Sequence, residues 1–111
     1  ISMNKARVIV MFLSVLFCGS AHAEAIKNSE FLKLSEGQQH WWYNGAYTAL
    51  GHIVSMKNDA KKTQCVWDWY FKNPSDREKQ LVKSFELYPD HAPTGIVISL
   101  LRRDCGVFNQ K

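Results

Sequence analysis

The chain has 111 residues, of which 46% are hydrophobic and 22% are charged. This length is enough for one compact domain and excludes a large multidomain enzyme. The formal net charge is +4, from 14 Lys and Arg against 10 Asp and Glu. Such a surplus can indicate nucleic acid or an anionic membrane surface as a partner, so its position in the chain matters.

The first 23 residues have the pattern of a secretory signal peptide. A basic stretch at Met3–Arg7 precedes an apolar run at Val8–Phe17, and Ala21-His22-Ala23 supplies a small-residue cleavage site. A retained membrane anchor is the alternative, but the run is shorter than the roughly 20 residues that span a bilayer. We expect the two residues before Met3 to be additions to the leader. We therefore expect cleavage after Ala23 and a protein located in the periplasm.

The mature chain, residues 24–111, is nearly balanced in charge. Removal of Lys5 and Arg7 with the leader lowers the formal net charge from +4 to +2. The remaining basic pairs, Lys61-Lys62 and Arg102-Arg103, are typical of solvated helix ends. We therefore expect no nucleic-acid partner, and no membrane attachment once the leader is removed.

Cys65 and Cys105 are the two cysteines that remain after Cys18 leaves with the leader. In an oxidising compartment two such residues are expected to form a disulfide. The bridge would close a loop of about 40 residues, worth roughly 4 kcal/mol in the chain-entropy model. Reactive thiols usually have a C-x-x-C spacing or basic surroundings, which favours a structural role for this pair.

Residues 38–57 have the periodicity of an amphipathic helix. Its predicted buried face consists of Trp42, Ala46, Ala49, Leu50, Ile53 and Met56, widened by Tyr43, Tyr47 and Val54. A second stripe at helical spacing consists of Trp41, Gly45, Thr48 and His52. Its small residues would let another backbone approach, either a second helix of the chain or a second subunit. We predict that this stripe lies at a two-fold interface of a homodimer.

The rest of the mature chain also has helical patterns. Residues 57–63 are polar and predicted to be a loop, and the aromatic cluster at 66–71 is too short to assign. A helix is predicted to start near Pro74, capped by Asn73 or by a Ser75/Glu78 capping box, and to end at Pro89. Another is predicted to start at Pro93 and to stop near Gly106, with a buried face of Ile96, Val97, Leu100 and Leu101.

The predicted class is therefore all-α: a small domain of three main helices and a short one at Ser29–Leu34, with one disulfide.

Groups that could carry catalysis are sparse. His40 and His52 are twelve residues apart on one predicted helix, which separates them by over three turns. Asp76 and Glu78 lie in the first turn of a predicted helix, where the dipole favours negative charge. The sequence contains no H-E-x-x-H, G-x-S-x-G or P-loop motif. We therefore expect no catalytic residues, no metal site and no cofactor.

The mature chain contains, in order, the helical stretch Tyr43-Asn44-Gly45-Ala46-Tyr47-Thr48-Ala49-Leu50-Gly51, then Cys65, the Asn73-Pro74 helix start, the Tyr88-Pro89 helix end, and a helix from Pro93 to Cys105. This order resembles the Rap/Tai immunity proteins of bacterial type VI secretion systems. The resemblance covers Trp42 to Phe108. One departure is that the sequence has no cysteine between Glu24 and Gln64, where members often carry one.

The resemblance implies an all-helical periplasmic protein, commonly a homodimer, that inhibits a peptidoglycan amidase injected by sister cells. Such a protein gives self-resistance by blocking the toxin's active-site cleft and does no chemistry itself. We consider two connecting segments as candidates for this contact. The candidate residues are Lys57, Asp59, Lys61 and Lys62 in the first segment, and Tyr88, Asp90 and His91 in the second.

Two other classes stay open. One is a periplasmic acid-stress chaperone of the HdeA kind, also a small helical dimer with one disulfide, which would need a switch driven by titration. The aromatic content of 13%, with four Trp, is more typical of a fixed core and interface. The other class is a hydrolase or cell-wall enzyme.

Overall fold

The structure is a computed structural model that describes residues 26–109. The predicted leader, including Cys18, lies outside these residues. The described part forms α2 (Asn28–Phe31), α3 (Glu36–Ser55), α4 (Ala60–Phe71), α5 (Pro74–Leu87) and α6 (Pro93–Cys105), and it contains no strand. The predicted all-α class is therefore confirmed. None of these helices combines the length and apolar character needed to cross a membrane.

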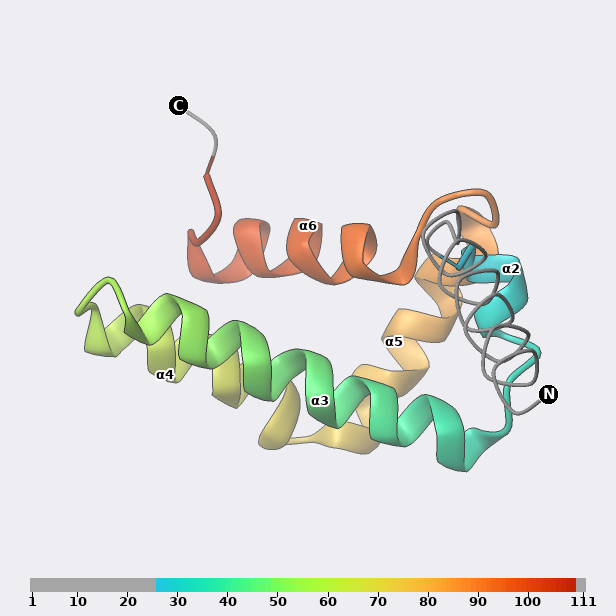
Figure 1. Cartoon of the computed structure of the whole chain (residues 1–111), viewed down its shortest axis with the longest axis horizontal. Coiled ribbons are helices and arrows are strands. Elements are labelled where there is room, and N and C mark those ends of the chain that lie inside the picture. The colour runs from blue at the N-terminus through green and yellow to red at the C-terminus, as the bar shows by residue number, and fades with distance from the viewer. Residues whose placement is uncertain (1–25, 110–111) are drawn as a thin grey trace, which may run out of the picture.

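The helices are arranged around the pair formed by α3 and α4. These two lie side by side and antiparallel along the length of the domain (Figure 1). The chain then turns into α5, which leads towards α2, and α6 runs back to pack on α4 and α5. As a result, the α3–α4 turn and the α5–α6 turn lie at opposite ends of the domain (Figure 1).

The core is built mainly from aromatic rings of four helices. Tyr47 on α3 stacks on Tyr70 of α4, with 4.8 Å between ring centroids, and on Trp69 at 5.4 Å. Phe31 of α2 meets Phe85 of α5 edge to face at 5.3 Å. Because such rings bury large areas and have preferred geometries, their packing fixes how α3, α4 and α5 lie against one another.

The buried face of α3 differs from the predicted one. Ile53 is 46% exposed and Met56 is 77% exposed, and Ala49 is also exposed. The residues that are buried are Tyr43, Tyr47, Gly51 and Val54. The prediction was wrong for Ala49, Ile53 and Met56 because α3 packs through its tyrosines, which reach the rings of α4.

A close contact at Gly51 explains the tight packing of α3 on α4. The indole of Trp67 lies across Gly51, in the space that a Cβ atom would occupy. At Gly45, which we expected to allow a close approach of another backbone, no atom lies within 4 Å of the place that a Cβ atom would take. The glycine that permits close packing within the chain is therefore Gly51.

The segment 57–71 is more helical than predicted. Helix α4 begins at Ala60, inside the predicted loop 57–63, and continues through the aromatic cluster to Phe71. Asp59 caps it, since its Oδ1 accepts a hydrogen bond of 3.0 Å from the backbone N–H of Lys62. Lys61 and Lys62 are therefore on the first turn of a helix, and the prediction that they lie in a loop was wrong.

The predicted helix starts at Pro74 and Pro93 are confirmed, and both prolines occupy the first turn. Asn73 is the N-cap residue of α5, but its side chain bonds Asp76 instead of the helix backbone. The alternative Ser75/Glu78 capping box is not formed, because α5 begins at Pro74 and Ser75 therefore lies within the helix. Glu78 instead bonds residues of α3 and α4. Gly106 ends α6 in the left-handed conformation, with φ of 66°.

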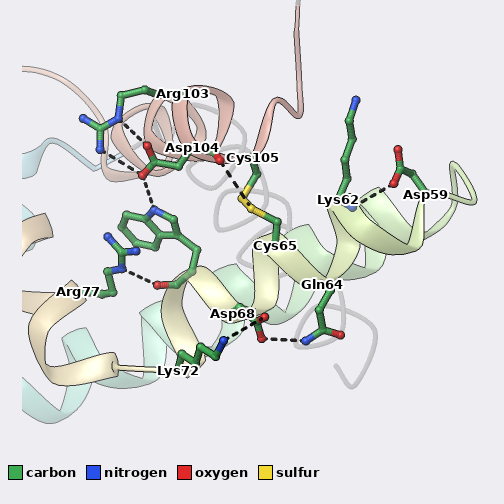
Figure 2. Close-up of a disulfide and its surroundings, with 11 residues drawn as sticks. Asp59, Lys62, Gln64, Cys65, Asp68, Lys72, Arg77, Arg103, Asp104 and Cys105 are labelled. Atoms are coloured by element: carbon green, nitrogen blue, oxygen red, sulfur yellow. Dashed lines mark hydrogen bonds and ion pairs between the residues drawn. A yellow bond between two sulfur atoms is a disulfide. The ribbon is translucent and has the colours of Figure 1, made fainter.

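The predicted pairing of Cys65 with Cys105 is confirmed. Their disulfide joins α4 to the last residue of α6, with the two Cα atoms 5.7 Å apart (Figure 2). The closed loop contains all of α5 and nearly all of α6, because the cysteines are 40 residues apart in sequence.

Candidate functional site

A groove of about 920 Å³ lies between the first half of α3 and the length of α5. Gln39, His40 and Tyr43 line its α3 side, and Pro74, Glu78 and Val82 line its α5 side. Apolar surface with a few polar groups is the usual lining of a binding site. The polar groups of this groove are therefore the first candidates for a functional role.

Glu78 is the centre of a polar cluster in the groove. Its Oε2 accepts hydrogen bonds from the hydroxyl of Tyr70 at 2.9 Å and from Nδ1 of His40 at 3.1 Å. The amide of Asn44 lies 3.3 Å from Nε2 of His40 and also 3.3 Å from the Tyr70 hydroxyl. Because a carboxylate oxygen only accepts, Nδ1 must donate, and this places the proton of a neutral His40 on Nδ1.

The sequence did not predict this cluster. His40 and Glu78 are 38 residues apart and lie on different helices. In the sequence each had an ordinary explanation, His40 as a lone histidine and Glu78 as a first-turn acid. The second explanation was wrong, because α5 begins at Pro74 and Asp76 is the acid of its first turn. Only the packing of α5 against α3 and α4 brings the four side chains together.

Tyr70 of the cluster and the neighbouring Tyr43 and Tyr47 are buried, and their pKa values are raised. Burial is the largest cause of the raised pKa of Tyr43 and Tyr47, and for Tyr43 the charge of Glu78 raises it further. The pKa of Tyr70 is raised by burial and by its hydrogen bond to Glu78. The hydroxyls of Tyr43 and Tyr47 have no hydrogen-bond partner among the described residues. Of these three tyrosines, only Tyr70 therefore uses its hydroxyl in a hydrogen bond within residues 26–109.

The first predicted contact segment lies at the α3–α4 end of the domain. Lys57, Asp59 and Lys62 line a cleft of about 270 Å³ together with residues 106–109 of the C-terminal segment. Lys61 is exposed and does not line this cleft. Asn58, which forms the turn, has φ of 56°, a left-handed conformation that Asn tolerates better than most residues. The surface at the α3–α4 end of the domain is therefore formed by the α3–α4 turn together with the residues that follow α6.

The second predicted contact segment is the α5–α6 turn. Tyr88, Asp90 and His91 are all exposed, and the rings of Tyr88 and His91 meet edge to face at 5.4 Å. The turn is attached to the start of α2 through Asn28, whose Nδ2 donates to the Tyr88 carbonyl at 2.8 Å and whose N–H donates to the His91 carbonyl at 2.7 Å. The N–H of Ser29 donates to the Pro89 carbonyl at 3.0 Å.

The two predicted contact segments do not form one surface. They lie at opposite ends of the domain (Figure 1). A partner that docks on one end of a single subunit would therefore contact only one of them.

The predicted dimer stripe forms the outer side of α3. Trp41, Gly45, Thr48 and His52 are all exposed, and Trp41 is 74% exposed. The neighbouring residues Ala49, Ile53 and Met56 extend this outer face. Glu36, in the first turn, is the only Asp, Glu, Lys or Arg in α3. The stripe therefore belongs to a largely uncharged surface that the described part of the chain leaves uncovered.

No group of three or more His, Cys, Asp or Glu within residues 26–109 is placed to hold a metal ion.

Comparisons of the chain with protein-family models, with curated proteins and with solved structures found no match.

Proposed function

We propose that this protein is a periplasmic immunity protein that binds and inhibits a secreted peptidoglycan amidase, without hydrolytic activity of its own. The observation that carries the proposal is the ordered resemblance from Trp42 to Phe108 to the Rap/Tai family. The fold supports it in its details: helices begin at Pro74 and Pro93 and end near Tyr88 and Gly106, and a disulfide joins Cys65 to Cys105.

The inhibitory contact is proposed at one end of the domain. Exposed charges at the rim of an interface mainly change the association rate and specificity, whereas they add little to the stability of the fold. Lys61 at the α3–α4 end and Asp90 at the α5–α6 end are both exposed. Each therefore offers a charge that can be reversed without disturbing the core.

The proposed homodimer uses the outer side of α3. A large exposed apolar surface is costly on a soluble monomer and is typical of an interaction site. Trp41 and Met56 are 74% and 77% exposed, respectively. The association of two copies through this face would cover both.

Co-expression tests the function directly. A periplasmic amidase encoded beside this gene should lyse cells that lack the protein and spare cells that contain it. The purified protein should bind that amidase and block its cleavage of peptidoglycan. The proposal fails if no neighbouring gene encodes such a toxin and the purified protein instead prevents aggregation of unfolded clients at low pH, which is the chaperone outcome.

Charge reversal then identifies the contact. Lys61→Glu and Asp90→Lys change opposite ends of the domain, so each variant serves as the matched control for the other. We expect one of them to weaken the complex, with the main effect on the association rate, while both keep the wild-type unfolding midpoint. Lys61→Glu places a negative charge at a helix N-terminus, which favours α4. A complex unaffected by either change would exclude both ends as the contact.

A further inference from the structure

The groove between α3 and α5 contains the carboxylate of Glu78, with which no Lys or Arg of residues 26–109 forms an ion pair. The side chain of Glu78 is 25% exposed, and its two hydrogen bonds from Tyr70 and His40 both end on Oε2. Within residues 26–109, Oε1 accepts no hydrogen bond and no Lys or Arg forms an ion pair with Glu78. A partly buried carboxylate with one oxygen that accepts no hydrogen bond favours a nearby cation.

The lysines of the groove do not supply that cation. Lys79 and Lys83 line the groove, but they also line a second hollow on α5 with Asp76 and Leu87. They therefore lie on the ridge of α5 between the two hollows. Glu36 and Glu86 also line the groove and add two further carboxylates.

The walls of the groove favour an arginine as the source of the cation. Tyr43, Pro74 and Val82 provide apolar surface on which the methylene stem of a long basic side chain can pack. A guanidinium group is more weakly hydrated than an ammonium group, and its planar donors match a carboxylate. A guanidinium group therefore loses less hydration free energy when it moves from water to a half-buried site.

We propose that the groove between α3 and α5 is a docking site for an arginine side chain of another protein, with Glu78 binding its guanidinium group. The stem packs on the apolar walls of the groove, and the guanidinium donates to Oε1 of Glu78. This inference goes beyond the immunity role, because it states the chemistry of the partner's residue and does not require the partner to be an amidase.

Two capped tripeptides test the inference by NMR titration of the isotope-labelled mature protein. One is alanine-arginine-alanine, and the other replaces arginine by citrulline, which has nearly the same shape and no charge. We expect saturable shifts of groove amides, such as those of His40 and Glu78, with the arginine peptide. Affinity for the citrulline peptide should be at least about tenfold lower, because hydrogen bonds between charged groups are the stronger ones.

Variants assign the binding to Glu78. Glu78→Gln keeps the size of the side chain and should lower the affinity for the arginine peptide by about tenfold or more. Glu30→Gln, which removes an exposed carboxylate on α2 outside the groove, should leave it unchanged. Ser75→Trp narrows the groove from the exposed first turn of α5 and should also reduce binding, so the test remains valid if Glu78→Gln is unstable.

The inference is overturned if the arginine peptide gives no saturable shifts. It is also overturned if the arginine and citrulline peptides bind equally. A third contradicting result would be that Glu78→Gln or Ser75→Trp folds like the wild type and binds the arginine peptide with the wild-type affinity. None of these results bears on the co-expression test, so a failure here is distinguishable from a failure of the proposed function.

Discussion

The indole Nε1 of Trp69 donates a hydrogen bond of 2.7 Å to the carboxylate of Asp104, the residue that precedes Cys105. Trp69 follows Cys65 by four residues, so this bond and the disulfide join α4 to α6 at points about one helical turn apart on α4. Arg103 bonds the same carboxylate at 2.8 Å. The hydrogen bonds from Arg103 and Trp69 hold the pKa of Asp104 below its ordinary value, against the effect of burial.

We predict that the disulfide contributes a large part of the stability. Replacing Cys65 and Cys105 together by Ser should lower the free energy of unfolding by roughly 4 kcal/mol, because the unfolded chain gains the freedom of a 40-residue loop. Urea unfolding measures this loss, and the wild type under reducing conditions should reproduce it. Two free thiols in periplasmic material, detected by mass spectrometry, would contradict the role assigned to the bridge.

Two glycines of α3 should respond oppositely to the same change. Gly51→Ala places a methyl group against the Trp67 indole and should cost about 1–3 kcal/mol of stability through overpacking. Gly45→Ala meets no atom within 4 Å and should stabilise by up to about 1 kcal/mol through helix propensity. Thermal unfolding of the two variants compares them directly. Equal effects would mean that Trp67 can leave Gly51 without cost.

Removing the hydroxyl of a buried tyrosine should lower stability only where that hydroxyl forms a hydrogen bond. Tyr47→Phe removes an unpaired buried hydroxyl and keeps the ring stack, so stability should be unchanged or higher. Tyr70→Phe removes the hydrogen bond to Glu78 and should cost about 1.5–3 kcal/mol, as is typical of bonds to charged groups. Urea unfolding of both variants tests this contrast, and a larger loss for Tyr47→Phe would contradict it.

Alkaline pH should destabilise the fold through the same residues. The pKa values of Tyr43, Tyr47 and Tyr70 are raised in the folded state from an ordinary value of 10.0. Above that pH the unfolded chain releases protons that the folded chain keeps, so the free energy of unfolding falls as pH rises. Urea unfolding at a series of pH values measures how steeply the free energy of unfolding falls with pH. This slope should be smaller in a Tyr43→Phe/Tyr47→Phe variant. An equal slope would show that other groups cause the loss.

The dimer interface can be tested at Gly45. Its Cβ position is open, so Gly45→Leu should leave the helical content intact while it places a bulky side chain on the outer side of α3. Light scattering should then detect monomers, whereas the wild type and Gly45→Ala remain dimeric. A wild type that is strictly monomeric at micromolar concentration would refute the predicted interface.

Local signals made much of the fold predictable. Pro74 and Pro93 act through their restricted backbone and Gly106 through its backbone freedom, so the starts of α5 and α6 and the end of α6 could be placed from the sequence. Helix α4 was not predicted because its first turn is polar, and its buried residues Val66 and Trp69 are recognisable as one face only when the helix is known to start at Ala60.

Features that depend on tertiary packing were not predictable. Helix α3 has apolar residues on most of its circumference, so no single face stands out, and the tyrosine contacts with α4 decide which side is buried. The pairing of His40 with Glu78 likewise depends on the packing of α5. The two residues are 38 apart in sequence, and no local pattern predicts their contact.

The attachment of the α5–α6 turn to α2 has a consequence for how this protein can evolve. The three acceptors are main-chain carbonyls, of Tyr88, Pro89 and His91, and the donors are the amide and backbone of Asn28 and the backbone of Ser29. These hydrogen bonds therefore place no requirement on the side chains of Tyr88, Asp90 or His91. Substitutions at these three positions can therefore change the surface chemistry of the turn while its backbone shape is kept.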